Sequence, residues 1–76
     1  MLNKNIELRI IHIVKKILKN KKINTLTGPS NCEEWDSLNH MLIITEISKY
    51  FKKKISFKEI LEIYSVKDLV NIISKK

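Results

Sequence analysis

Residues 32–47, CEEWDSLNHMLIITEI, set the organisation of the chain. An acidic stretch ends at Asp36 and Ser37, and an apolar run at helical spacing follows. Serine and aspartate are favoured at helix N-caps, where a side-chain oxygen accepts a free backbone N–H. The stretch therefore predicts a helix over residues 37–51, with Asp36 and Ser37 sharing the cap. The apolar stripe of this helix is predicted to be Leu38, Ile44, Ile47 and Phe51, with Leu42 and Ile43 on its flanks.

Three further helices are expected on either side of this stretch. Residues 3–20 form an amphipathic pattern. Ser56 and Glu59 stand three apart, as a capping box requires, and so begin a short helix. Ser65 and Asp68 have the same relation at the start of the last helix. Inward-facing positions are predicted at Ile6, Ile10, Ile13, Val14 and Ile17 in the first helix, and at Leu69, Val70 and Ile73 in the last. The fold class is all-α, a small bundle of three longer helices plus one short helix.

The segment before the 37–51 helix reads as a long loop, because residues 21–34 contain the only glycine and the only proline. A loop of this length often has a functional reason. Ile23 and Leu26 are expected to hold it against the core. Trp35 is expected to pack the loop on the next helix, with contact to a bound group or partner as the alternative. Cys32 is expected to be an inert thiol, since two acidic residues follow it.

Length and composition limit the classes of protein to which this chain can belong. Residues 1–76 suffice for a single small domain, and 43% hydrophobic residues are enough for a core. One cysteine excludes an internal disulfide and a zinc site built on cysteines. His12 is expected at the edge of the first helix's buried face and His40 in solvent. The chain shows no signal-peptide pattern and no membrane-spanning run, so we expect a soluble, cytoplasmic protein with no membrane contact.

The net charge of +7 raises the alternative of a nucleic-acid-binding domain. Arg9 is the only arginine among fifteen basic residues, however, whereas base readout and bidentate phosphate binding favour arginine. The chain is rich in Ile, Lys and Asn and has no alanine, which is typical of a bias toward AT-rich codons. The charge alone therefore gives little support to nucleic-acid binding.

Ser37 has three interpretations. It shares the helix cap with Asp36, it acts as a nucleophile, or it carries a phosphodiester. Nucleophilic catalysis needs a positioned base and an oriented third group, and no Gly-x-Ser-x-Gly elbow surrounds this serine. A helix N-terminus, by contrast, is a prepared site for an anion.

Residues 35–51, WDSLNHMLIITEISKYF, resemble the acyl carrier protein signature Asp-Ser-Leu, in the variety in which Trp precedes the Asp. Residues 55–73, ISFKEILEIYSVKDLVNII, are similar to the downstream half of that family. The resemblance covers about residues 32–74 in sequence detail and the remainder in helix-and-loop layout.

The resemblance implies an all-α carrier domain and not an enzyme. Ser37 would be the covalent attachment site of 4′-phosphopantetheine, donated from coenzyme A by a phosphopantetheinyl transferase. Asp36 would be its neighbour in the motif, and Leu38 would anchor the start of the helix. The thiol of the arm would hold an acyl or aminoacyl group as a thioester, in lipid or secondary metabolite biosynthesis.

The same resemblance implies partner enzymes that load and use the acyl or aminoacyl group. They would dock on the 37–51 helix around Asn39, Met41 and Leu42, and the carrier would be a monomer. Members of the family usually present carboxylates there, whereas this chain has Asn39, Leu42, Ser48 and Lys49. We therefore expect a partner with an apolar or acidic docking surface. Two other functions remain open: a small basic nucleic-acid-binding helical domain, and an unmodified interaction module with the carrier fold.

Overall fold

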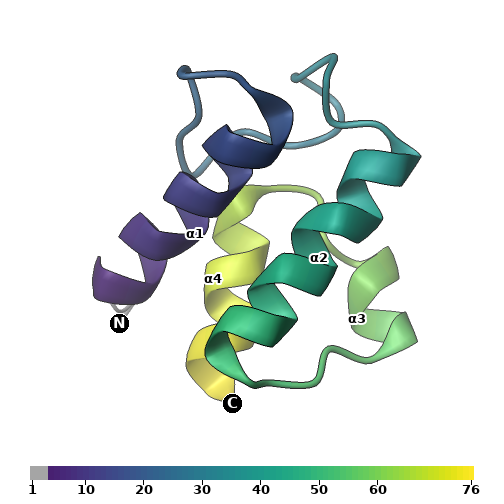
Figure 1. The fold of residues 1–76 in the computed structure, drawn as a ribbon. Helices are drawn as coiled ribbons and strands as arrows, with labels where there is room; N and C mark the ends of the chain where they lie inside the picture. The colour runs from purple at the N-terminus through teal and green to yellow at the C-terminus, as the bar shows by residue number, and fades with distance from the viewer. Residues whose placement is uncertain (1–3) are drawn as a thin grey trace.

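The computed structural model describes residues 4–76, which contain four α-helices and no β-strand. The helices are α1 (Lys4–Leu18), α2 (Ser37–Phe51), α3 (Phe57–Leu61) and α4 (Val66–Lys75). The prediction of a small all-α bundle of three longer helices and one short helix is confirmed. α1 packs against both α2 and α4, while the short α3 lies on the far side of α2 from α1 (Figure 1). Residue 3, the predicted start of the first helix, lies outside the described residues.

The interior of the bundle is aliphatic. Its largest fully buried side chains are Ile10, Val14, Ile43, Ile47, Val66, Leu69, Val70 and Ile73. Burial of one such side chain is worth about 1.5–3 kcal/mol, so this cluster is the main source of stability. The inward positions predicted for α4 are confirmed, and those predicted for α1 are buried or packed against the buried cluster.

The buried face of α2 differs from the predicted stripe. Ile43, placed on the flank by the prediction, is fully buried together with Ile44 and Ile47, whereas Leu38 is 70% exposed. The expectation that Leu38 anchors the start of the helix is therefore wrong. The physical reason is that Trp35, 2% exposed, fills the space between the loop and the first turns of α2.

The long loop over residues 19–36 is docked on the start of α4. The carbonyls of Thr25 and Thr27 accept hydrogen bonds from the N–H groups of Lys67 (2.9 Å) and Val66 (2.8 Å), which satisfies two of the free donors at that helix end. A side chain on Gly28 would collide with the backbone carbonyl of Tyr64, so only glycine allows this close approach.

The residues that hold this loop to the core are partly those predicted. Ile23 is buried, as expected, but Leu26 is 71% exposed, so the expectation that it pins the loop is wrong. Thr27 takes that place, because its hydroxyl accepts the Asn24 N–H at 3.0 Å while its backbone bonds to α4. A polar residue is buried here because each of its hydrogen-bonding groups has a partner.

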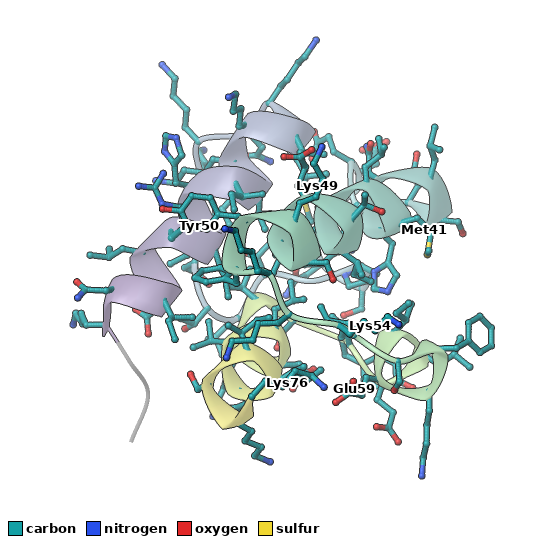
Figure 2. All side chains as sticks on the ribbon, turned by 60° about the horizontal axis from the view of Figure 1, so that its bottom comes forward. Met41, Lys49, Tyr50, Lys54, Glu59 and Lys76 are labelled. Carbon is teal, nitrogen blue, oxygen red and sulfur yellow. The ribbon has the colours of Figure 1, made fainter. Side chains whose placement is uncertain are left out.

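The two predicted caps are both present, in different forms. Ser56 and Glu59 form the reciprocal capping box of α3. The Ser65 hydroxyl accepts the N–H of Asp68 at the start of α4, but the Asp68 carboxylate accepts from the N–H of Tyr64, one residue earlier than a capping box requires. Glu59 also pairs with the Lys76 ammonium at 3.2 Å, which ties the end of α4 to α3 (Figure 2).

Candidate functional site

The start of α2 separates the roles of Asp36 and Ser37. Asp36 is the N-cap residue: its carboxylate accepts the N–H of Asn39 at 2.9 Å and its carbonyl accepts the N–H of His40. Ser37 is the first residue of the helix and is exposed. Within residues 4–76, no hydrogen bond engages its hydroxyl. The expectation that the two residues share the cap is wrong, because Asp36 performs it alone and leaves the Ser37 hydroxyl uncommitted.

Trp35 and His40 fix the geometry behind this serine. The Trp35 indole N–H donates to His40 Nδ1 at 2.9 Å, and His40 Nε2 lies 3.1 Å from the carbonyl oxygen of Ile60 in α3. Because the indole can only donate, Nδ1 carries no proton and Nε2–H donates to Ile60. His40 is half-buried, so its expected place in solvent is wrong. It links the loop, α2 and α3, whereas the predicted packing role of Trp35 is confirmed.

An apolar groove of about 540 Å³ opens beside Ser37. It lies between the start of α2 and the short α3, and its lining is Pro29, Trp35, Asp36, Ser37, His40, Met41, Phe57, Ile60, Leu61, Ile63 and Tyr64. Phe57, Leu61 and Tyr64 are each more than 60% exposed, so they form a rim of apolar surface around the serine. A groove of this kind can hold a flexible, partly apolar group.

The predicted docking residues do not form one surface. Met41 lines the Ser37 groove, whereas Leu42 lines a different hollow, between α2 and α1. The side-chain amide of Asn39 donates to the Glu34 carbonyl at 2.8 Å and so belongs to the start of the helix. Met41 and Leu42 are both about half exposed, and they extend the apolar surface of α2 in two directions.

The groove residues of α3 and of the following loop were missed by sequence reasoning. Phe57, Leu61 and Tyr64 gave no signal of their own, since apolar side chains in a short helix are ordinarily assigned to the core. The signal that could have found them is their spacing: Phe57 and Leu61 stand four apart and therefore share one face of the helix. Ile60 and Ile63 also line the groove, but they are less exposed because they pack on the hydrophobic core.

The segment of sequence around Ser37 is negatively charged despite the basic composition. Residues 23–48 contain four of the eight acidic residues and none of the fifteen basic ones. Hydrogen bonds from its own backbone N–H and from the Asn20 amide lower the pKa of the Glu34 carboxyl, so this group is charged at neutral pH. The loop before α2 thus presents carboxylates to any enzyme that approaches the serine.

Cys32 lies in the same loop and is buried. Burial, together with the hydrogen bond from its thiol to Glu34 (3.4 Å) and the charge of that carboxylate, raises the pKa of the Cys32 thiol. The thiolate, which is the reactive form, is therefore disfavoured. The expectation of an inert thiol agrees with this environment.

Comparisons with known proteins identify no family. Neither the protein-family models nor the curated proteins match this chain. Among residues 4–76, no helix has the length and apolar character needed to cross a membrane.

Proposed function

We propose that the protein is a carrier domain of the acyl carrier protein type, with 4′-phosphopantetheine attached to Ser37. The observation that carries the proposal is the exposed Ser37 hydroxyl, free of the capping role that Asp36 performs. A serine in this position is accessible to a modifying enzyme, and its loss does not remove the helix cap. The attached 4′-phosphopantetheine would provide a terminal thiol that holds an acyl or aminoacyl group as a thioester.

The attachment chemistry suits the start of α2. The Ser37 oxygen would attack the pantetheine-linked phosphate of coenzyme A and form a phosphodiester, while adenosine 3′,5′-bisphosphate leaves and the serine proton passes to the transferase. The resulting negative phosphodiester would sit in the first turn of α2, where free N–H groups and the positive end of the helix dipole stabilise an anion. The groove lined by Met41, Phe57 and Tyr64 would contact the apolar part of the arm.

The carrier itself performs no chemistry in this proposal. The carrier would only present the Ser37 hydroxyl at the start of α2, and the hydrogen bonds of His40 with Trp35 and Ile60 hold that helix to the loop and to α3. A phosphopantetheinyl transferase and the enzymes that load and use the cargo are the partners, and the cytoplasm is the proposed location.

The test is a mass measurement. The unmodified protein is incubated with coenzyme A and a phosphopantetheinyl transferase of broad specificity, and the intact mass is recorded. We expect a gain of one phosphopantetheine for the wild type and for Ser30→Ala, a matched exposed loop serine, and none for Ser37→Ala.

The fold of the variant must be checked in parallel. Because Asp36 is the cap, Ser37→Ala should change the free energy of unfolding by less than about 0.5 kcal/mol. A gain of mass by Ser37→Ala would disprove the site. No gain by the folded wild type with several transferases would instead favour an unmodified interaction module.

A further inference from the structure

A second groove runs along the face shared by α1 and α2, where its lining on α2 extends from Leu42 to Phe51. Two hollows of about 600 and 530 Å³ adjoin there and share Arg9, His12 and Tyr50 in their lining. The apolar part of the second hollow consists of Ile13, Ile17 and Leu42. No residue that lines these two hollows also lines the groove beside Ser37, so the two grooves are separate even though Leu42 stands only five residues after Ser37.

Arg9 is the distinctive group in this groove. Its guanidinium carbon lies 4.8 Å from the centre of the Tyr50 ring, a cation–π contact between α1 and α2. Figure 2 shows Tyr50 on the side of α2 that faces α1. Both side chains are exposed, and within residues 4–76 the only salt bridge joins Lys76 to Glu59. Arg9 is therefore held in place by an aromatic ring but has no carboxylate partner in that part of the chain.

Positive charge continues along the α1 side of the groove. Lys16 stands seven residues after Arg9, two turns along the same face of the helix, and is also exposed; the polar side chain of His12 lies between them on that face. Glu46 is the one carboxylate among the lining residues of the two hollows, and Lys49 follows it by one turn of α2. The groove thus has a basic wall on α1 beside an apolar floor.

We propose that this groove docks an acidic amphipathic helix of a partner protein. A carboxylate of that helix would accept a bidentate hydrogen bond from Arg9, whose stacking on Tyr50 reduces the side-chain entropy lost on binding. The apolar face of the docked helix would cover Ile13, Ile17 and Leu42. Leu42 and Tyr50 are eight residues apart, or about 12 Å, which matches two turns of a docked helix. The inference does not depend on the modification of Ser37.

Charge complementarity alone would also admit a nucleic acid, but the geometry favours a protein. Arg9 covers one face of the Tyr50 ring, which reduces the surface on which a base could stack. The floor of the groove is aliphatic and recessed between two helices, whereas phosphates need an accessible basic surface. An amphipathic helix uses both the floor and the basic wall.

The test uses synthetic peptides and the Ser37→Ala protein, so that the attachment site takes no part. The probe is a peptide of about 18 residues, long enough to be partly helical, with leucines at spacings of three and four and glutamates between them. A peptide of the same composition in scrambled order and a peptide with glutamine in place of glutamate are the controls. Binding is followed by amide chemical shifts of the labelled protein, and a short DNA duplex is titrated separately.

We expect the acidic helix to bind with a dissociation constant below about 1 mM and to shift amides of α1 and α2 around Arg9 and Tyr50. Arg9→Glu should weaken binding at least about tenfold, as should Lys16→Glu. Lys58→Glu, an equal charge change on exposed α3, should leave it unchanged. Equal binding of the scrambled peptide, shifts outside the groove, or tighter binding of the DNA duplex at the same residues would each overturn the proposal.

Discussion

Replacing His40 by phenylalanine removes both nitrogen atoms that join Trp35 to α3. The side chain of Trp35 is only 2% exposed, so in the variant its indole N–H would have neither His40 nor water as an acceptor. Leaving a buried donor unpaired costs about 1–3 kcal/mol. The Ile60 carbonyl is only half-buried and can bond to water, so its contribution is smaller. We therefore expect a loss of about 2 kcal/mol in the free energy of unfolding.

That loss is large for a domain of this size. A change of 1 kcal/mol shifts the melting temperature of a small domain by about 4–8 °C, so His40→Phe should lower it by about 8–16 °C. Urea unfolding followed by far-UV circular dichroism measures the free energy directly. The denaturant slope should stay unchanged, since the folded state buries the same surface.

A double-mutant cycle isolates the hydrogen bond from the change in packing. Trp35→Phe keeps an aromatic ring and removes the N–H, so His40→Phe should cost much less in that background. We expect a coupling free energy of about 1 kcal/mol or more between the two positions. Additive effects, agreeing within about 0.3–0.5 kcal/mol, would show that the contact between Trp35 and His40 does not stabilise the fold and would refute this reasoning.

Three further outcomes follow from local features. The Cys32 thiol should react with iodoacetamide far more slowly in the folded protein at pH 7 than in urea, because burial raises its pKa; equal rates would contradict this. Lys52 ends α2 with φ 55°, so Lys52→Gly should add about 0.5–1 kcal/mol of stability by chemical unfolding, whereas Lys53→Gly should not. The hydrogen bond from the Ser56 N–H, with that from Lys76, lowers the pKa of Glu59; its stabilisation is present above the ordinary value of 4.5 and lost as pH falls through the folded value. Glu59→Gln should therefore flatten the acid side of the stability curve, and an unchanged curve would count against the pairing.

The helices could be predicted because their signals are local. The bounds of α2 at Ser37 and Phe51 follow from a cap, an apolar repeat and a lysine-rich end, all of which are read within one segment. Ser56 with Glu59 likewise specifies the start of α3 through two hydrogen bonds three residues apart. The same spacing at Ser65 and Asp68 gives a cap but not the reciprocal capping box, so spacing specifies the start of a helix more reliably than the exact hydrogen bonds.

Contacts between distant segments could not be predicted in the same way. Whether Leu38 or Trp35 fills the space at the start of α2 depends on where the loop runs, and that path is set by Thr27 and Gly28 against the start of α4. His40 looked polar and exposed because its two partners, one in the loop and one in α3, are five and twenty residues away.

The candidate site likewise combines features that the local sequence specifies with features that depend on distant segments. Ser37 and its neighbour Asp36 were found from their order in the sequence, but the freedom of the Ser37 hydroxyl depends on which of the two performs the cap. Both side chains are common caps, so the sequence left the choice open. The groove beside the serine required the position of α3, which the sequence predicted as a helix but could not place against α2.

The charge distribution bears on the proposed carrier function, because carrier proteins are usually acidic whereas this chain is basic. Residues 23–48, the loop and most of α2, hold no basic residue, so this segment would not repel a basic patch on an enzyme; the apolar or acidic partner surface expected from Asn39, Leu42, Ser48 and Lys49 stays a prediction. The fifteen basic residues lie outside this segment: on α1, in residues 19–22, and from Lys49 at the end of α2 onward. Arg9, on α1, borders the second groove. Arg9 contacts Tyr50, which stands thirteen residues after Ser37 and so about 20 Å further along α2, whereas the Debye length is about 8 Å at physiological salt. The charge of Arg9 is therefore largely screened at Ser37, whose nearest charged neighbours in the sequence are the carboxylates of Glu33, Glu34 and Asp36.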